Sequence, residues 1–574
     1  MTIDRSGAAK AVLTRCAALS AALLGLAVVP RFAVAADCSV EGLNGLNTAH
    51  LKVASATLVP AAPPKQEYCD VKGSVATDGE GAGPSSAGFE LMLPAHWNGK
   101  YMFSGVRGTG GNLNSAANGP DLEQFMVKGY ASVTSDQGHT NADRKWNYTE
   151  PGQGNMPKLV DYFYRSVHQV TLATKDLVRA WYQTPQIAHA YFDGCSNGGR
   201  EGPMEAARYP EDYDGIIAGS TWLDPVGSAL ADLKNVKALI KAPIPLSKID
   251  EIDAAIFEQC DAADGVKDGL IQNPAACSFK PESLVPKVLT KEQAQALKTY
   301  LSAVRDDKGN LVFPGTPVSD LKMQFGLSDA RMVESDEPAA DPRAAQPWGK
   351  GGEVPHLWQS ATGVILTLGY RDPSVDLNNT IEEDGGVVKA DALKTLYGRL
   401  RPDIVDDPER LKGFLSRGGK LILYHGLSDP IISPYSTIWF YEDLAAQEGG
   451  YDAVQRDARL FLVPAMQHCN DGPTPTRFDT LTALENWVEK GVGPDSISST
   501  HMNGKTPDRS LPLCKFPEMP HYKGSGDVKD EQNWSCNVKD RSMLKTGLNG
   551  AEAGVDRRER QTTLVKGSPG DPVE

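Results

Sequence analysis

Short apolar runs bounded by glycine or polar residues recur along the chain and predict buried β-strands. They cover residues 100–104, 130–135, 189–193, 215–219, 420–425 and 459–464. Apolar residues near helical spacing predict a helix over 159–182, between the second and third runs, and another over 480–490, after the last. Strands that alternate with helices are typical of an α/β fold, in which helices cover both faces of a mostly parallel sheet.

The pattern changes between residues 224 and 408. This stretch is helical in places (246–260 and 291–304), rich in Pro, Gly and Asp, and without buried-strand runs. We therefore expect an α/β core formed by residues 36–223 and 409–540, with residues 224–408 inserted between two core strands. Residues 541–574 are polar and are expected to be a disordered tail.

Residues 1–35 have the pattern of a secretory signal peptide. Basic residues precede the apolar run 16–30, and Ala33-Val34-Ala35 matches a small-x-small cleavage site. The run is too short to span a bilayer, and no other stretch is long and apolar enough to do so. We predict a secreted or periplasmic protein without a membrane span.

Composition and charge narrow the function classes. The 574 residues are 40% hydrophobic and 23% charged, which excludes a disordered or collagen-like chain and leaves material for a large core. The net charge of −15 and the lack of a Lys/Arg-rich run argue against nucleic acid as a partner. The oligomeric state is left open by the sequence.

Residues 194–198, Gly-Cys-Ser-Asn-Gly, match G-x-S-x-G, the nucleophile elbow of α/β-hydrolases. In this motif a strand turns sharply into a helix, so the positions two residues either side of the serine must lack bulk. The bare pattern also arises by chance, but here an apolar strand precedes it and a helix over 200–208 follows. We predict Ser196 as the nucleophile rather than a structural turn, with the Asn197 N–H as an oxyanion donor.

Two polar residues that follow predicted strands complete the order Ser, Asp, His. Asp429 lies just past the strand over 420–425, where catalytic groups of α/β sheets collect. His468 ends the loop after the strand over 459–464. A turn-forming Asp and a buried structural His are the alternatives. In a triad, His468 would take the Ser196 proton and return it to the leaving alcohol, and Asp429 would orient the imidazole.

Removal of the signal peptide leaves eight cysteines, an even number that favours disulfides in an exported chain. Cys195 precedes Ser196 and Cys469 follows His468. If Ser196 and His468 lie within hydrogen-bond reach, these two cysteines can approach disulfide distance. A pair of reduced, buried cysteines is the alternative.

The Cys-Ser, Asp and His-Cys arrangement resembles the tannase/feruloyl esterase family. So do the strings GCSNGGREGPMEAARYPEDYDGIIAG, HGLSDPIISP and PLCKFPEMPHYKGSGD, and the resemblance runs from about Cys38 to Cys536. It implies an α/β-hydrolase fold with a large inserted lid, a Cys195–Cys469 disulfide and hydrolysis of esters of aromatic carboxylic acids. The family includes feruloyl esterases, tannases and mono(2-hydroxyethyl) terephthalate hydrolases.

The segment after the first predicted core strand, Gly105-Val106-Arg107-Gly108-Thr109-Gly110-Gly111, has fewer glycines than the corresponding family segment. We expect the Gly108 N–H to be the second oxyanion donor. Arg107 and Thr109 depart from the family pattern, and Arg107 would lie near enough to the pocket to engage a substrate carboxylate.

Residues 260–271 read CDAADGVKDGLI and place three carboxylates on a short loop with two glycines. Oxygen ligands of this kind suit Ca²⁺ better than Zn²⁺, although the spacing is not that of an EF-hand, and a solvated acidic turn is the alternative. The resemblance implies a structural Ca²⁺. Its ligands would be the side chains of Asp261, Asp264 and Asp268 and the carbonyls of Val266 and Leu270.

The remaining cysteines are paired by their position. Cys260 and Cys277 flank the acidic loop, and we pair them as its clamp. The same local argument pairs Cys514 with Cys536 and leaves Cys38 with Cys69.

These observations together predict a secreted serine esterase that forms an acyl-enzyme on Ser196 and acts on a small-molecule ester of the feruloyl, hydroxycinnamoyl or galloyl type. One alternative is an aromatic monoester hydrolase like the mono(2-hydroxyethyl) terephthalate hydrolases, which would differ in the lid. A second is a non-catalytic, calcium-stabilised binding protein, which would lack a triad member. A third is a metal-dependent hydrolase that uses the acidic loop, for which chelation would abolish turnover at once.

Overall fold

The computed structural model describes residues 37–538, except residue 47, residues 115–119, residue 144, residues 327–355, residues 383–385 and residue 471. The predicted signal peptide and the predicted tail over 541–574 lie outside the described residues.

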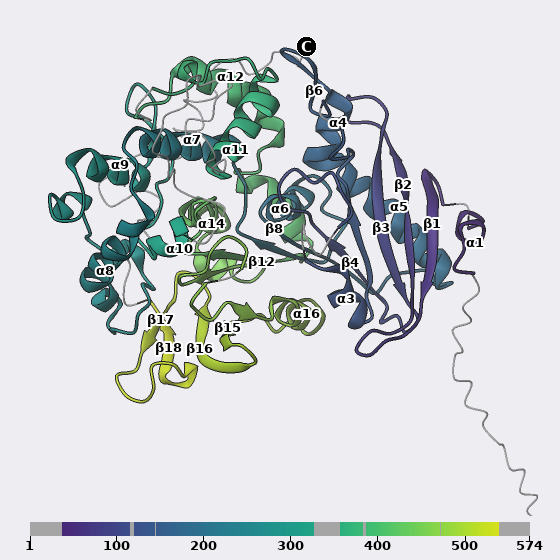
Figure 1. Ribbon diagram of the computed structural model, residues 1–574. Helices are drawn as coiled ribbons and strands as arrows, with labels where there is room; N and C mark the ends of the chain where they lie inside the picture. The colour runs from purple at the N-terminus through teal and green to yellow at the C-terminus, as the bar shows by residue number, and fades with distance from the viewer. Residues whose placement is uncertain are drawn as a thin grey trace, which may run out of the picture.

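A nine-stranded sheet runs through the molecule (Figure 1). In spatial order its strands are β1 (Leu51–Val59), β2 (Tyr68–Thr77), β3 (Ser85–Pro94), β5 (Ala131–Ser135), β4 (Lys100–Ser104), β8 (His189–Cys195), β9 (Gly215–Gly219), β12 (Lys420–Gly426) and β13 (Ala458–Val463). The pairs from β1 to β5 are antiparallel, and every pair from β5 to β13 is parallel. The six strands predicted from apolar runs are therefore the six strands of the parallel part.

The parallel strands read as apolar runs because both faces of this part of the sheet are covered. Ile216 and Ile217 are both fully buried on β9, and they belong to different hydrophobic clusters. One cluster includes Phe192 and Leu423, and the other includes Tyr191 with residues of the helix over 480–490. Alternate side chains of each strand thus fill two cores, one on each face of the sheet.

Strands β1, β2 and β3 carry charged residues that interrupt any apolar run. Lys72 on β2 faces Glu90 on β3, and their side chains form a salt bridge of 2.9 Å. Antiparallel strands can expose one face, as parts of β1 and β2 do, and the charged residues break the apolar runs from which strands are predicted.

Helices cover the sheet. They are α3 (Leu122–Val127), α4 (Met156–Val160), α5 (Ser166–Trp181), α6 (Asn197–Arg208), α13 (Lys412–Ser416), α14 (Pro434–Glu448), α15 (Tyr451–Val454) and α16 (Thr480–Lys490), with α1 (Val40–Asn44) beside β1. A π-helical segment, Asp161–Arg165, joins α4 to α5, so the helix predicted over 159–182 is continuous but wound more widely at its start. Helix α16 has the predicted bounds.

The chain between β9 and β12 forms a mostly helical body on one side of the sheet (Figure 1). Its elements are α7 (Pro225–Lys241), α8 (Ile249–Cys260), α9 (Lys291–Leu301), β10 (Val304–Arg305), β11 (Leu311–Phe313), α10 (Leu321–Gly326), α11 (His356–Thr362), a second π-helical segment, Gly363–Tyr370, and α12 (Ala390–Leu400). The position of this body between two neighbouring core strands is the one expected for the insertion.

Smaller β elements complete the fold. They are the hairpin β6 (Tyr148–Glu150) and β7 (Gln153–Gly154), the sheet of β14 (Arg477–Phe478), β15 (Ser496–Asn503) and β16 (Thr506–Cys514), and the pair β17 (Met519–Tyr522) and β18 (Trp534–Asn537). Among the described residues, no helix has the length and apolar character needed to cross a membrane.

Candidate active site

Ser196 forms the turn between strand β8 and helix α6. Its φ of 65° and ψ of −121° are strained for a residue with a side chain. The Ser196 N–H donates to the Gly219 carbonyl of β9 (3.0 Å), and its carbonyl accepts from the Arg200 N–H of α6 (3.0 Å). These bonds to the next strand and to the following helix hold the serine in the conformation of a nucleophile elbow.

The two glycines of the G-x-S-x-G motif are required by close backbone packing. A Cβ on Gly194 would lie 2.6 Å from the backbone of Gly198. A Cβ on Gly198 would lie 2.9 Å from the backbone of Gly105, which follows β4. Helix α6 therefore begins directly against two strand ends, as the motif predicts.

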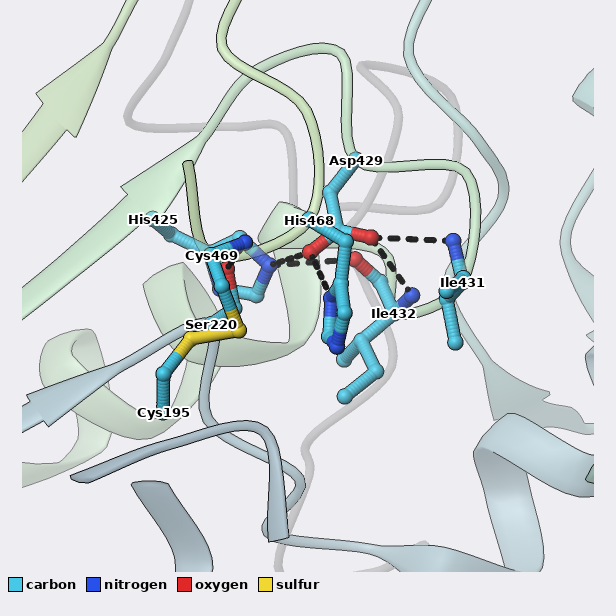
Figure 2. Close-up of a disulfide and its surroundings, with 8 residues drawn as sticks. All are labelled: Cys195, Ser220, His425, Asp429, Ile431, Ile432, His468 and Cys469. Atoms are coloured by element: carbon cyan, nitrogen blue, oxygen red, sulfur yellow. Dashed lines mark hydrogen bonds and ion pairs between the residues drawn. A yellow bond between two sulfur atoms is a disulfide. The ribbon is translucent and has the colours of Figure 1, made fainter. Parts of the chain in front are cut away.

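Asp429 and His468 meet because they follow neighbouring parallel strands, β12 and β13. His468 Nδ1 lies 2.8 Å from Asp429 Oδ2 (Figure 2). An ionised carboxylate only accepts hydrogen bonds, so Nδ1 carries the proton and Nε2 is the nitrogen available to act as a base.

The Asp429 carboxylate is fully buried and has four hydrogen-bond donors. Oδ1 accepts from the N–H groups of Ile431 (2.9 Å) and Ile432 (3.0 Å), and Oδ2 accepts from His468 and from Nε2 of His425 (3.1 Å). Burial alone would raise the pKa of Asp429. The charge of His468 and the hydrogen bonds from both histidines outweigh burial and hold this pKa well below its usual range.

A disulfide joins Cys195 to Cys469, with an S–S distance of 2.10 Å and a Cα–Cα distance of 5.8 Å (Figure 2). It links the residue before Ser196 to the residue after His468. The other three disulfides join Cys38 to Cys69, Cys260 to Cys277 and Cys514 to Cys536. All four bridges join the pairs that we expected.

Ser196 and His468 line one cavity of about 890 Å³. No hydrogen bond joins their side chains in the described part of the chain, and in ligand-free enzymes this contact often tightens only when substrate binds. The lining also includes the aromatic side chains of Trp146, Tyr162 and Trp222 and the amide side chains of Asn112, Asn141, Asn147, Gln359, Gln467 and Asn470. The described lining contains no acidic side chain.

The insertion and both π-helical segments contribute to this cavity. Tyr162 lies in the segment that joins α4 to α5, and Val364, Thr367 and Leu368 lie in the segment after α11. π-helical turns occur often at functional sites because they displace side chains from regular helical positions. The insertion therefore forms one wall of the cavity, as a lid would.

Both predicted oxyanion donors belong to residues that line the cavity together with Ser196. Asn197 is the first residue of α6, and Gly108 lies in the turn after β4 with φ of 59°. The Gly108 carbonyl accepts from the Tyr162 hydroxyl (3.2 Å), which ties this turn to the π-helical segment. Arg107 also lines the cavity, and its Nε is buried without a hydrogen-bond partner.

Glu201 is a buried residue of this region for which we had no sequence signal. One carboxyl oxygen accepts from Asn197 Nδ2 (3.2 Å) and from the Gln137 side chain, and the other accepts from the Val106 N–H (3.3 Å). Burial raises the pKa of Glu201 to about 8, and the charge of Arg200 and the hydrogen bonds offset this only in part. Glu201 is therefore mostly protonated at neutral pH.

His425 is a second residue that we did not single out. It lies in β12, within the run that we interpreted only as a buried strand, and its side chain is fully buried. A histidine inside an apolar run and four residues before the predicted acid would have been the signal.

The predicted metal loop brings Asp261 and Asp268 together. Asp261 Oδ1 accepts from the N–H groups of Asp268 and Gly269 (both 3.1 Å), and Asp268 Oδ1 accepts from the Leu270 N–H (3.1 Å). Asp268 Oδ2 is paired with the guanidinium of Arg509 from β16. The side chain of Asp264 lies outside the described residues. Carboxylate and carbonyl oxygens are the ligands that Ca²⁺ prefers, so the residue types of this loop fit the ion.

Comparisons with known proteins identify the family of this chain. The family model described as "Tannase and feruloyl esterase" matches residues 69–537. The chain is 30% identical over 539 residues to a mono(2-hydroxyethyl) terephthalate hydrolase of Piscinibacter sakaiensis, covering 84% of this chain and 86% of that protein. It is 30% identical over 467 residues to a probable feruloyl esterase of Arthroderma benhamiae, covering 78% of this chain and 81% of that protein.

Two solved structures share the fold. Feruloyl esterase B from Aspergillus oryzae superposes with a TM-score of 0.71 at 22% identity, covering 86% of this chain and 98% of that one. A tannin acyl hydrolase from Aspergillus niger superposes with a TM-score of 0.69 at 19% identity, covering 92% and 99%. The expected α/β-hydrolase fold class is confirmed, and the chain belongs to the tannase and feruloyl esterase family of carboxylic ester hydrolases.

Proposed function

We propose that this protein hydrolyses small esters of aromatic carboxylic acids, of the feruloyl, hydroxycinnamoyl or galloyl type, through Ser196, His468 and Asp429. Family membership supports the hydrolysis of aromatic esters. One observation carries the assignment of residues: His468, bonded to the buried carboxylate of Asp429, shares a cavity wall with Ser196 on its strained turn.

The reaction would proceed through an acyl-enzyme. His468 Nε2 takes the Ser196 hydroxyl proton while Oγ attacks the ester carbonyl carbon, and the resulting oxyanion lies at the N–H groups of Asn197 and Gly108. Collapse of this intermediate expels the alcohol, which receives the proton from His468. Water then attacks the acyl-enzyme, with His468 again taking a proton, and the aromatic acid leaves.

The cavity suits an aromatic acyl group with polar substituents. Trp146, Tyr162 and Trp222 supply surfaces against which an aromatic ring can pack, and the amide side chains can bond ring hydroxyls. A volume of about 890 Å³ is sufficient for a small ester and excludes a folded macromolecule.

A second candidate is an aromatic monoester that keeps a free carboxylate. Arg107 lines the cavity, and the described lining has no acidic side chain to repel an anion. One relative is named a mono(2-hydroxyethyl) terephthalate hydrolase. A monoester of this kind would place its free carboxylate towards Arg107.

We also propose that the loop after α8 holds a structural Ca²⁺, with the side chains of Asp261, Asp264 and Asp268 and the carbonyls of Val266 and Leu270 as ligands. The ion would neutralise the clustered carboxylates of the loop and would take no part in the reaction. We further propose export from the cytoplasm. Four disulfides support an oxidising compartment, and the N-terminal pattern supports a signal peptide.

The test is the initial rate of hydrolysis of a panel of esters by the purified mature protein. The panel contains methyl ferulate, methyl gallate, mono(2-hydroxyethyl) terephthalate and p-nitrophenyl acetate, with Ser196→Ala as the control. A preference of about ten-fold or more for one aromatic acid, which is about 1.4 kcal/mol in transition-state binding, identifies the substrate class. Activity that survives in Ser196→Ala contradicts the mechanism.

A further inference from the structure

The Asp429 carboxylate is bonded to a second imidazole, that of His425. His425 Nε2 lies 3.1 Å from Asp429 Oδ2, the same oxygen that receives the His468 hydrogen bond. Figure 2 shows His425 on one side of the Asp429 carboxylate and the backbones of Ile431 and Ile432 on the other. His425 therefore closes the side of the carboxylate that the backbone donors leave open.

The hydrogen-bond partners of His425 determine its tautomer. Nε2 also lies 3.0 Å from the Ile432 carbonyl, so both of its neighbours, this carbonyl and the Asp429 carboxylate, are acceptors. Nε2 must then carry a proton. Nδ1 lies 2.7 Å from the hydroxyl of Thr437 on α14, which can donate to it.

Thr437 extends this chain of hydrogen bonds further from the cavity. Its hydroxyl lies 2.6 Å from that of Thr221, which follows β9, and both threonines are fully buried. With a neutral His425, each group donates to the next, from Thr221 through Thr437 and His425 to Asp429. Hydrogen bonds that run in one direction polarise one another and strengthen the last of them.

We propose that His425 is a positioning residue for catalysis: it holds Oδ2 of Asp429 at the Nδ1 of His468 and disperses part of the carboxylate charge. This inference rests on the proposed function of Ser196, His468 and Asp429. His425 does not line the cavity and would not touch the substrate.

Two further titratable groups interact electrostatically with Asp429 in the described part of the chain, Asp232 on α7 and Tyr300 on α9. Burial raises the pKa of Asp232 well above its usual value and also raises the pKa of Tyr300. Both residues are present in the wild type and in a His425 variant, so a difference between the two pH profiles reports on the imidazoles and the Asp429 carboxylate.

The test compares His425→Leu, which removes the donor, with His425→Gln, whose side-chain amide can still donate to Asp429. We expect His425→Leu to lower kcat by about ten-fold or more, with KM unchanged within about two-fold, because the contact to Asp429 acts on the reaction and not on substrate binding. The acid limb of its kcat/KM profile should move to higher pH, since a carboxylate with one donor fewer stabilises protonated His468 more strongly. His425→Gln should restore most of the rate and the profile.

A folded His425→Leu protein with the wild-type rate and pH profile would overturn the inference, as would a His425→Gln protein no better than His425→Leu. If His425→Leu does not fold, Thr437→Val removes the hydroxyl next to Nδ1 and should shift the acid limb in the same direction; an unmoved limb contradicts the proposal. The Ser196→Ala variant distinguishes a failure of the proposed triad from a failure of the proposed role of His425. Activity in that variant refutes the triad, whereas its inactivity beside a fully active His425→Leu refutes only the role of His425.

Discussion

Oε1 of Glu201 lies 3.2 Å from Nδ2 of Asn197, the residue that follows the proposed nucleophile. The same carboxyl group bonds the Val106 N–H, two residues before Gly108. One buried group thus connects the start of α6 to the turn after β4. Because the two proposed oxyanion donors lie in these two segments, Glu201 fixes the distance between them.

Glu201→Gln should make the stability of the protein less dependent on pH. The pKa of Glu201 is raised on folding to about 8, so its contribution to stability is complete below the unfolded value of about 4.3 and is lost as pH rises towards 8. The wild type should lose at most about 1.4 kcal/mol per pH unit relative to Glu201→Gln over this window. Urea unfolding of both proteins at pH 5, 6.5 and 8 measures their free energies of unfolding. A difference between wild type and variant that is the same at all three pH values would contradict the prediction.

Asp429→Asn should lower kcat by about 10³- to 10⁴-fold, because the amide favours the wrong His468 tautomer and does not stabilise the imidazolium. The pKa of Asp429 is lowered on folding, so its ionised form stabilises the fold at pH values above the ordinary value of about 3.9. This contribution to stability is lost only as pH falls through the lowered pKa of Asp429 in the folded protein. The stability deficit of the variant should thus be constant from pH 5 to 8 and shrink in strong acid. Asp391→Asn, at an exposed position on α12, is the matched control and should show neither effect.

The Cys195–Cys469 disulfide should be needed for activity as well as for stability. Replacing both cysteines by alanine removes a cross-link across 274 residues, for which the loop-entropy relation gives on the order of 5 kcal/mol. It also frees the residues next to Ser196 and His468, so kcat should fall. Replacing Cys514 and Cys536, separated by 22 residues, should cost on the order of 3 kcal/mol and leave kcat unchanged. The test is to measure the melting temperature and kcat of both double variants. Equal kcat values would refute the catalytic role of the Cys195–Cys469 bridge.

Removal of calcium should lower the melting temperature without an immediate loss of rate. A bound ion stabilises the native state by about 2.7 kcal/mol at a concentration 100 times its Kd, and chelation removes this contribution. Asp261→Asn should reproduce the loss of stability and abolish the response to chelator. Differential scanning calorimetry with and without EDTA, followed by addition of CaCl₂, makes the comparison. Instant inactivation well below the melting temperature would instead indicate a catalytic metal.

The parallel part of the sheet could be predicted because burial on both faces leaves continuous apolar runs such as residues 215–219. Strands β1 to β3 could not, because pairs such as Lys72 and Glu90 are satisfied only by the neighbouring strand. The π-helical turn at Asp161–Arg165 has no periodicity that separates it from the regular helix around it.

In the site, too, some residues could be predicted from local sequence and others depend on distant partners. Ser196, Asp429 and His468 each follow a predicted strand, and local pattern was enough to select them. Glu201 and His425 gain their roles only from partners on other elements, such as Val106 and Thr437, which lie 95 and 12 residues away. A charged residue on a helix does not indicate such partners, and the position of His425 in an apolar run, four residues before Asp429, indicates a role without naming Thr437 as its partner.

The sequence separation of 274 between Cys195 and Cys469 also sets the order of events during synthesis of the chain. Ser196 leaves the ribosome long before its proposed base exists, and the bridge that would join the two cannot close until Cys469 has followed. A chain whose synthesis stops within the insertion has a nucleophile with neither base nor cross-link. If the proposed triad is correct, the protein becomes an esterase only near the end of its own synthesis, and shorter fragments should be inactive.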